Sequence, residues 1–401
     1  FSPAKVLKGK FSQSTKGRLV RKLLVIFQFT ATITLLVFAF TVNQQIKHLQ
    51  NVDLGVALDN TLVVRRPALM LEDSLYISAM TTFINDASSS VGIKSIASSS
   101  ALPGVEFHEM GLTTELWPES VDENIQGSYT YYMYDIDEYY FKTLDIKLVA
   151  GRNFGREDED QVIINKRSLE LLGYSSAEEA IGSRLIFGYN ENERSEIIGV
   201  IEDFHQRSPK EEFIPLVFNY TQVGTHYTFK LEAGKEDHVL THIKSIWEEH
   251  FPDAALDYFF LDKRYQQQYK MEASFSAVTS IFTGVFLIIA ILGLYGLSSY
   301  TILQRKKEIG VRKILGASLR RLISLISKDY LKLVITATLI ACPVAYYLVL
   351  LWLENYSTRI QISWGLFAAP STLIIVIAFL SILGQTLKTT TANPVDSLRY
   401  E

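Results

Sequence analysis

Long apolar segments separated by charged stretches dominate the pattern of hydrophobic and polar positions along this chain. Four segments are almost free of Asp, Glu, Lys and Arg, and each is rich in large aliphatic and aromatic residues. A helix needs about 20 such residues to cross a bilayer. The pattern therefore predicts four transmembrane helices, at residues 23–46, 273–303, 329–353 and 364–387.

The first two helices are expected to extend beyond the bilayer. The sequence after residue 46 keeps its helical character in a polar stretch. A second polar helical run, residues 261–274, leads into the uncharged stretch 273–304, which is longer than a bilayer requires. We expect both helices to project from the membrane as a pair of stalks.

Two smaller features of the spans predict how they pack. Glycines allow neighbouring helices to approach closely, and we expect this of Gly284, Gly293 and Gly296. Aromatic side chains gather at membrane boundaries. The residues expected to form such a belt are Tyr346, Tyr347, Trp352, Tyr356 and Trp364.

Between the first two spans, residues 47–272 change to strand-like alternation and short amphipathic helices. Residues 61–98 read as a strand, a helix over 74–86 and a second strand, and residues 226–261 repeat this order. A long insert separates the two units. Its strand-like segments are residues 128–134, 161–165, 195–203 and 215–219.

These elements predict a multi-span α-helical membrane protein with a large α+β extracytoplasmic domain between its first two of four transmembrane helices. The charges divide in the same way. Residues 44–273 contain 38 acidic and 20 basic residues, whereas the remainder contains 5 acidic and 19 basic residues. The acidic body disfavours nucleic acid as a partner, because that affinity rests on Lys and Arg that neutralise phosphates. The basic remainder suits anionic membrane lipids.

The basic segments also predict the orientation of the chain, because Lys and Arg near span ends stay on the cytoplasmic side. Seven basic residues and no acidic one precede residue 23, whereas the connection 354–363 has Arg359 as its only base. Residues 1–22, 304–328 and 388–401 are therefore expected in the cytoplasm, and residues 47–272 and 354–363 outside it.

The cytoplasmic turn between the second and third spans has a pattern of its own. Residues 304–318 read QRKKEIGVRKILGAS. Ile309, Ile314 and Leu315 recur at helical spacing, while Gly316 is typical of a helix end and Ser318 of an N-cap. The pattern predicts a short amphipathic elbow at the inner face of the membrane, suited to docking a cytosolic partner.

The elbow resembles the R-x-x-E-I-G-x-R-K-x-L-G-A signature of FtsX-like permeases, the membrane subunits of MacB-type and lipoprotein-release-type ABC transporters. The matching residues are Arg305, Glu308, Ile309, Gly310, Arg312, Lys313, Leu315, Gly316 and Ala317. Positive-inside charge alone does not require this combination. Residues 136–154 and 196–205 are also similar to segments common in bacterial members.

The resemblance implies a permease subunit in the bacterial inner membrane. It would couple ATP hydrolysis by a separate cytosolic ABC ATPase to movement of the extracytoplasmic domain, for export or release of a substrate. Polar contacts to the ATPase would come from Glu308, Arg312 and Lys313. Ile309, Ile314 and Leu315 would fill a groove on it, and Gly310 and Gly316 would set the turn.

The resemblance also implies an internal division of the extracytoplasmic domain and further partners. A porter-like part would comprise residues 58–104 and 223–262, with an inserted lobe at 105–222. Residues 2–10 and 393–401 are similar to each other, which suggests the C-terminal half of a duplicated permease. The expected partner in the membrane is then an N-terminal half or a second copy, and a periplasmic adaptor is left open.

The sequence predicts no catalytic centre, metal site or cofactor. It contains no G-x-x-x-x-G-K-[ST], H-E-x-x-H or G-x-S-x-G motif. His238 and His242 stand four apart, but no third ligand lies near them in sequence, and an exposed helix face is the favoured interpretation. Residues 157–160 (EDED) lack the rest of a calcium loop. With Cys342 as the only cysteine, no intrachain disulfide can form.

Two other function classes remain open. An FtsX-type signalling scaffold would activate a cell-wall hydrolase without carrying a substrate, although the length of the outer domain favours export or release. A membrane-anchored sensor would have no ATPase partner. A channel or ion-coupled carrier is disfavoured, because the uncharged stretches of the spans hold no ionisable side chain other than Tyr and Cys342.

Overall fold

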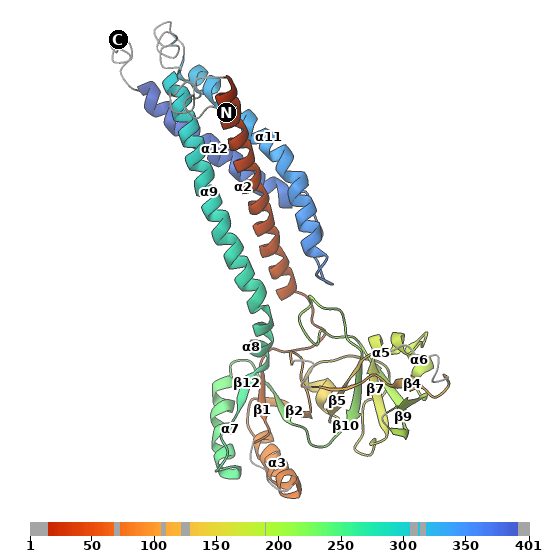
Figure 1. Ribbon diagram of the computed structural model, residues 1–401. Coiled ribbons are helices and arrows are strands. Elements are labelled where there is room, and N and C mark those ends of the chain that lie inside the picture. The colour runs from red at the N-terminus through yellow and green to blue at the C-terminus, as the bar shows by residue number, and fades with distance from the viewer. Residues whose placement is uncertain are drawn as a thin grey trace, which may run out of the picture. The chain divides into compact units, whose positions relative to one another are not determined.

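A computed structural model describes residues 15–67, 73–105, 110–121, 129–188, 190–304, 312 and 318–391 (Figure 1). The chain divides into two compact units. The helical unit takes its residues from Phe1–Gln50, Met271–Asn355 and Arg359–Glu401, and the strand-rich unit takes its residues from Asn51–Lys270 and Tyr356–Thr358.

Within the described residues of the helical unit, four helices are long and apolar enough to cross a membrane. They are α2 (Thr15–Gln50), α9 (Lys270–Gln304), α11 (Leu319–Leu353) and α12 (Gly365–Thr391). Helices α2 and α9 have 36 and 35 residues. At about 1.5 Å per residue each is longer than the roughly 30 Å of a bilayer core. The predicted fold class is confirmed, with a mixed α/β domain between α2 and the other three.

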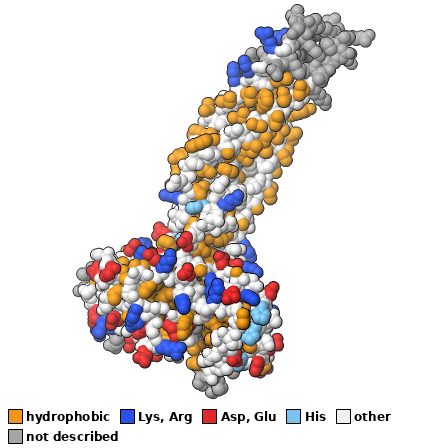
Figure 2. All heavy atoms as spheres, turned by 180° about the vertical axis from the view of Figure 1, so that it is seen from behind, with side chains coloured by type: hydrophobic (Ala, Val, Ile, Leu, Met, Phe, Trp, Pro, Cys, Tyr) orange, Lys and Arg blue, Asp and Glu red, His pale blue; other side chains and the backbone are white. Residues whose placement is uncertain are grey.

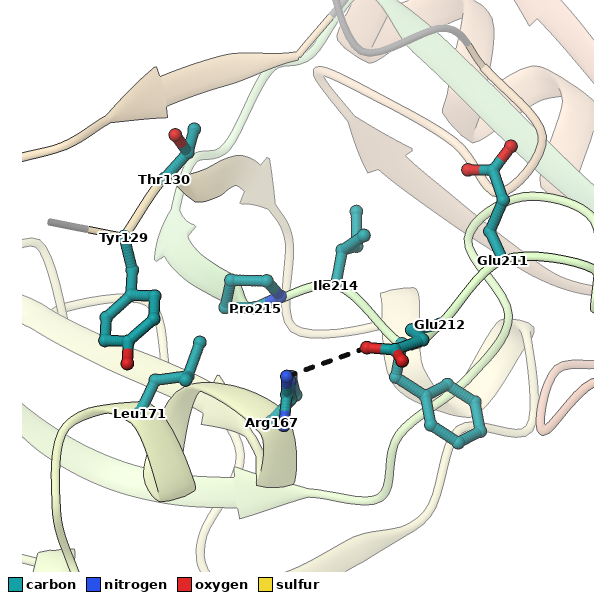
Figure 3. A pocket seen from close by; sticks show the side chains of 9 residues that line it. Tyr129, Thr130, Arg167, Leu171, Glu211, Glu212, Ile214 and Pro215 are labelled. Atoms are coloured by element: carbon teal, nitrogen blue, oxygen red, sulfur yellow. Dashed lines mark ion pairs between the residues drawn. The ribbon is translucent and has the colours of Figure 1, made fainter. Parts of the chain in front are cut away.

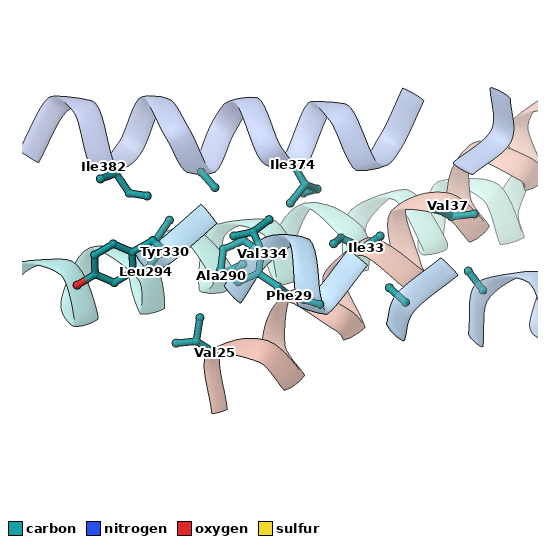
Figure 4. Close-up of a cluster of buried hydrophobic side chains, with 14 of the residues drawn as sticks. Val25, Phe29, Ile33, Val37, Ala290, Leu294, Tyr330, Val334, Ile374 and Ile382 are labelled. Carbon is teal, nitrogen blue, oxygen red and sulfur yellow. The ribbon is translucent and has the colours of Figure 1, made fainter. Parts of the chain in front are cut away.

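The helices meet along apolar stripes whose spacing matches the helical repeat (Figure 4). In α2 the buried residues Val25, Phe29, Ile33 and Val37 recur every fourth position. The stripe of α11 contains small side chains, and its buried residues are Tyr330, Val334, Ala337, Ala341, Ala345, Val349 and Leu353. Because lipid is as apolar as these side chains, close backbone approach at small residues is what favours association of such helices.

Helix α9 contributes less to this core than the other three helices. Only Ala290 and Leu294 of α9 are fully buried within it. A Cβ added at Gly293 would lie 2.5 Å from Oε1 of Gln28 in α2, so the prediction of a close approach is confirmed there. The same prediction is wrong for Gly284 and Gly296, because no described atom would lie within 4 Å of an added Cβ.

The residues predicted to form an aromatic belt differ in their exposure. Tyr346, Tyr347 and Trp364 are exposed on the helical unit. Trp352 is instead half-buried. Tyr356 has only 6% of its surface exposed and belongs to the strand-rich unit. Trp352 and Tyr356 therefore pack inside the protein, although the sequence had predicted that they are exposed.

The strand-rich unit is built on one mixed sheet of twelve described strands. The strands are β1 (Thr61–Arg65), β2 (Ile93–Ser99), β3 (Gly111–Thr113), β4 (Leu116–Pro118), β5 (Tyr131–Ile136), β6 (Leu148–Gly151), β7 (Gln161–Asn165), β8 (Arg184–Phe187), β9 (Asn190–Ile201), β10 (Leu216–Tyr220), β11 (His226–Leu231) and β12 (Tyr258–Phe260). Each strand-like segment expected from the sequence overlaps one of these strands.

The order of strands is β12-β1-β11-β2-β5-β10-β7-β9-β8-β4, with β3 on β5 and β6 on β9. The first four strands are antiparallel neighbours. The step from β2 to β5 rests on a single residue pair, Ser99 and Ile136. The sheet thus has two parts that are joined narrowly.

Each part of the sheet has its own hydrophobic core. Helices α3 (Asp73–Ser88) and α7 (Glu236–His250) pack on the part that contains β1 and β11. The buried side chains of α7 are Val239, Ile243 and Trp247, at successive intervals of four. In α3 the buried face is Tyr76, Met80, Phe83 and Ala87. Ile77 of the same helix is 44% exposed.

The second core lies between the strands β7 to β10 and the short helix α5 (Lys166–Leu171). Asn165 caps α5, because its side chain accepts a hydrogen bond from the backbone N–H of Ser168. The remaining short helices are α4 (Tyr140–Thr143), α6 (Ala177–Ala180), α8 (Leu261–Gln266) and the 3₁₀ turn η3 (Gln267–Tyr269).

The surfaces of the two units differ in chemistry (Figure 2). Hydrophobic side chains cover much of the helical unit, whereas Asp, Glu, Lys and Arg side chains gather on the strand-rich unit. The exposed apolar side chains of α9 include Phe282, Val285, Ile288 and Leu292. Such a surface is expected where lipid is the solvent.

Candidate functional site

Most of the predicted elbow lies outside the described residues. This applies to Arg305, Glu308, Ile309, Gly310, Lys313, Ile314, Leu315, Gly316 and Ala317. Arg312 is described, and it is helical and exposed. Ser318 occupies the N-cap position of α11 as predicted, but its side chain makes no capping hydrogen bond. The backbone carbonyl of Ser318 instead accepts from the N–H of Arg321 at 3.0 Å.

Polar side chains fasten α9 to its neighbours near the elbow. The amide nitrogen of Gln385 in α12 donates to the carbonyl oxygen of Tyr295 at 3.0 Å and to Oγ of Ser299 at 3.1 Å. The hydroxyl of Ser298 donates to the amide oxygen of the same glutamine. The Tyr330 hydroxyl of α11 donates to the carbonyl of Leu297 at 3.2 Å. At this end α9 is therefore held by hydrogen bonds more than by apolar packing.

A second polar and aromatic group lies toward the other end of the helical unit. Gln45 of α2 is fully buried, and its side-chain oxygen accepts from the backbone N–H of Ile360 at 2.9 Å. The Trp352 ring lies edge-on to Phe38 at 5.6 Å and is stacked on Phe275 at 6.3 Å. Three of the helices, α2, α9 and α11, therefore meet at one aromatic cluster.

The strand-rich unit contains two adjoining hollows beside the segment that connects β9 to β10, and Figure 3 shows the smaller one. The larger is about 530 Å³, and its lining is Arg167, Glu170, Asp203, His205, Glu211, Glu212, Phe213, Ser357 and Thr358. The smaller is about 320 Å³ and adds Tyr129, Thr130, Leu171, Ile214 and Pro215. Arg167 pairs with Glu170 at 3.2 Å and with Glu212 at 3.8 Å.

Burial shifts the pKa of two groups that line the larger hollow. Burial raises the pKa of the Asp203 carboxyl, although the backbone N–H of Arg167 donates to it at 2.9 Å. Burial likewise lowers the pKa of His205, although the charge of Asp53 opposes this. The His205 ring packs on the Phe213 ring with 4.5 Å between centroids. These hollows combine acidic groups with one ion-paired arginine and an aromatic wall.

Comparison with known protein families tests the resemblance carried by the elbow residues. The family described as FtsX-like permease C-terminal matches residues 280–394. This stretch begins within α9, includes the elbow motif and α11, and ends after α12. Residues 280–394 form an FtsX-like permease domain. The predicted resemblance is confirmed for this part of the chain.

The remaining comparisons concern the chain around the FtsX-like domain. The periplasmic region of MacB from Actinobacillus actinomycetemcomitans is 16% identical with a TM-score of 0.35, covering 56% of this chain and 98% of that one. The extracellular domain of the ABC-type transporter YknZ from Gram-positive bacteria is 14% identical with a TM-score of 0.33, covering 50% and 98%. No curated protein matches the sequence.

The groups considered for metal binding lie outside the FtsX-like domain. His238 is exposed on α7 and His242 is half-buried. The described residues contain no group of three or more His, Cys, Asp and Glu side chains suited to a metal ion. In the acidic turn 157–160, Asp158 pairs with Arg152, which lowers the pKa of that carboxyl. Asp158 thus organises a turn.

Sequence reasoning missed several residues that the structure brings to these sites. Gln385 and Gln45 are uncharged residues in apolar segments, so hydropathy gave no reason to single them out. Ser357 lies in a short connection and donates to backbone carbonyls. Every residue has such a carbonyl, so the sequence does not indicate these contacts. Asp203 could have been suspected, because an acid directly after a buried strand such as β9 often meets backbone donors.

Proposed function

We propose that this protein is the permease subunit of an ABC transporter that moves its extracytoplasmic domain at the expense of ATP hydrolysed by a separate cytosolic subunit. The observation that carries the proposal is the FtsX-like domain at 280–394, which encloses the signature-bearing elbow. The permease itself is non-catalytic in this proposal. Its substrate is exported, or released from the membrane.

The proposed roles of the elbow residues follow the sequence signature. Glu308, Arg312 and Lys313 make polar contacts to the ATPase, and Ile309, Ile314 and Leu315 fill its groove. Gly310 and Gly316 set the turn, and Arg305 and Ala317 complete the signature. The exposed, helical state of Arg312 supports this arrangement, because a docking residue must be accessible. The elbow faces the cytoplasm, and the strand-rich unit lies outside it.

The elbow proposal predicts the effect of reversing one charge. Glu308→Lys should remove a polar contact with the ATPase and leave membrane insertion intact, because the substitution lies between the spans. Affinity purification of the membrane-embedded protein, with and without a non-hydrolysable ATP analogue, measures whether a cytosolic ATPase accompanies it. Glu249→Lys, on the exposed face of α7, is the matched charge reversal.

The three function classes give different results in this experiment. An ATPase that co-purifies with the wild type and the Glu249→Lys variant, but is lost with Glu308→Lys, supports the proposal. Recovery of the wild type without any ATPase contradicts it and favours an anchored sensor. An ATPase that comes with a cell-wall hydrolase favours the signalling scaffold. A second permease half or a periplasmic adaptor would be identified in the same samples.

A further inference from the structure

The strand-rich unit connects to the four helices through three segments of chain. Residues 51–55 follow α2, residues 265–269 precede α9, and Tyr356–Thr358 lie between α11 and α12. All three belong to the strand-rich unit. Within that unit they contact the same short stretch, residues 203–211, which we call the junction segment.

The segment after α2 contacts the start of the junction segment. The backbone N–H of His205 donates to the carbonyl of Leu54 at 2.8 Å. The next residue, Gly55, has a φ of +71°, and a Cβ there would lie 2.9 Å from the carbonyl oxygen of Asp203. No side chain fits between the two stretches of backbone. The α2 connection and the junction segment are therefore in direct backbone contact.

The segment before α9 contacts the middle of the junction segment. Tyr265 of α8 is only 2% exposed, and its hydroxyl donates to the carbonyl of His205 at 3.0 Å and also to that of Arg207. Residues 261–301 run as one helical segment from this tyrosine into the second span. Any axial shift of that helix is thus applied directly to two carbonyls of the junction segment.

The connection between α11 and α12 contacts the end of the junction segment. The N–H of Ser357 donates to the carbonyl of Lys210 at 2.9 Å, and its hydroxyl lies 2.8 Å from the carbonyl of Glu211 and 3.2 Å from that of Pro209. The Lys210 ammonium lies over the ring of the buried Tyr356, 5.3 Å from its centroid. Neither the short loop nor the junction segment has regular secondary structure here.

The junction segment is in turn anchored to strands β5 and β7 of the sheet and to the stretch that follows β2. The Asp203 carboxylate accepts from the side chain of Asn165, at the end of β7, at 2.7 Å. Gln206 is 3% exposed, donates to the carbonyl of Leu102 at 2.9 Å, and accepts from the Tyr134 hydroxyl of β5. Asp203, His205 and Glu211 also line the larger hollow.

We propose that residues 203–211 are a mechanical junction, in which movement of any of the three connections is passed to strands β5 and β7, to the stretch after β2 and to the hollow beside them. The proposal rests on the transporter function for the origin of the movement. The coupling itself is a property of this chain alone. Five of the contacts made by the connections go to backbone carbonyls of the segment itself, so the conformation of the segment, more than its side chains, carries the coupling.

The coupling can be measured by hydrogen–deuterium exchange of the full chain in lipid nanodiscs, without an ATPase. Tyr265→Phe removes the hydroxyl and keeps the ring. Because one hydrogen bond contributes about 0.5–1.5 kcal/mol, exchange should rise by about two- to tenfold. We expect the rise in peptides that contain His205 and also in those that contain Ser357. Ser357→Ala should raise exchange at His205 in return.

Two controls separate coupling from general loosening. Tyr258→Phe and Ser363→Ala make the same chemical changes on β12 and in the same outer connection, and should leave residues 203–211 unchanged. The core of α7 around Ile243 should be unaffected in all variants. A rise confined to the residues that contact the altered side chain overturns the proposal. If no ATPase partner exists, the proposed transporter function is wrong. The exchange result would still hold, because it is measured on this chain without an ATPase.

Discussion

Asp137 is the residue whose buried environment most clearly links the protein's stability to pH. Its carboxylate accepts hydrogen bonds from the backbone N–H groups of Ser98 at 2.7 Å and Tyr139 at 3.0 Å. Burial nevertheless outweighs these donors and raises the pKa of Asp137 from 3.8 to about 7. The carboxyl follows β5 beside the single residue pair that joins the two parts of the sheet. Its protonation therefore bears on that narrow joint.

The stability of the protein should depend on pH through this group. Because the folded pKa is raised, the folded state binds more protons than the unfolded state between pH 3.8 and about 7. The free energy of unfolding should fall by up to about 1.4 kcal/mol per pH unit as pH rises through this window. Thermal unfolding of the detergent-solubilised chain measures this, and Asp137→Asn should flatten that part of the profile.

The control for this prediction is Asp253→Asn, a matched change at an exposed aspartate. It should keep the slope of the wild type. An Asp137→Asn profile parallel to that of the wild type between pH 4 and pH 7 would show that burial does not hold the carboxyl neutral. At pH 8 the asparagine variant should be at least as stable as the wild type, because no charge has to be buried.

At the scale of elements, α9 is the helix whose attachment differs from the rest. It buries Ala290 and Leu294 in the helical core, and near the elbow it is linked to α11 and α12 by hydrogen bonds. Polar bonds between membrane helices contribute about 0.6 kcal/mol on average and up to about 1.7 kcal/mol. Such bonds are strong enough to set the position of α9 and weak enough to be exchanged during movement.

Gln385→Leu tests whether this attachment fixes α9. The substitution removes two donated bonds and one accepted bond, and it places an apolar side chain that a membrane helix tolerates. We expect a loss of roughly 1–2 kcal/mol in stability, measured by titration with a denaturing detergent. Gln304→Leu removes a bond within α9 only, to the Tyr300 hydroxyl at 2.7 Å, and should have a smaller effect. Equal effects would contradict the attachment.

Elements differed in how well the sequence could predict them. The four helices and β1, β7 and α7 could be predicted, because hydropathy and regular spacing extend over most of their length, although α11 begins at Leu319 and the predicted span at residue 329. The strands β3, β4, β6 and β8 have three or four residues, which is too short for alternation to be seen. The buried face of α3 could not be predicted from its apolar residues, because Tyr76 and Ala87 are buried whereas Ile77 is exposed. Burial there depends on α7, which lies far away in sequence.

At the scale of the whole molecule, the family could be predicted because a dense signature lies at 305–317, inside the stretch that the FtsX-like family matches. The junction segment could not be predicted. Its contacts join residues near 54, 205, 265 and 357 through backbone groups that every sequence has. The hollows beside it arise from the same contacts. Nothing in composition or spacing indicates which distant segments will share one loop.

The partition of charge makes a prediction about the whole chain. Residues 44–273 carry 38 acidic and 20 basic residues, and the basic excess lies in the remainder. Because Lys and Arg near span ends stay inside, Ser318 should lie in the cytoplasm, with Lys244 and Gln361 outside. All three residues are exposed, and Cys342 is the only native cysteine, so Cys342→Ala provides a background for single-cysteine variants.

A membrane-impermeant maleimide then reports the side on which each residue lies. In spheroplasts, Lys244→Cys and Gln361→Cys should be labelled and Ser318→Cys protected. In inverted membrane vesicles the pattern should reverse, because the cytoplasmic face is now accessible. Labelling of Ser318→Cys from outside would contradict the orientation and remove the elbow from the reach of any cytosolic ATPase. Protection of Gln361→Cys in spheroplasts, with Lys244→Cys labelled, would instead contradict only the span assignment of α11 and α12.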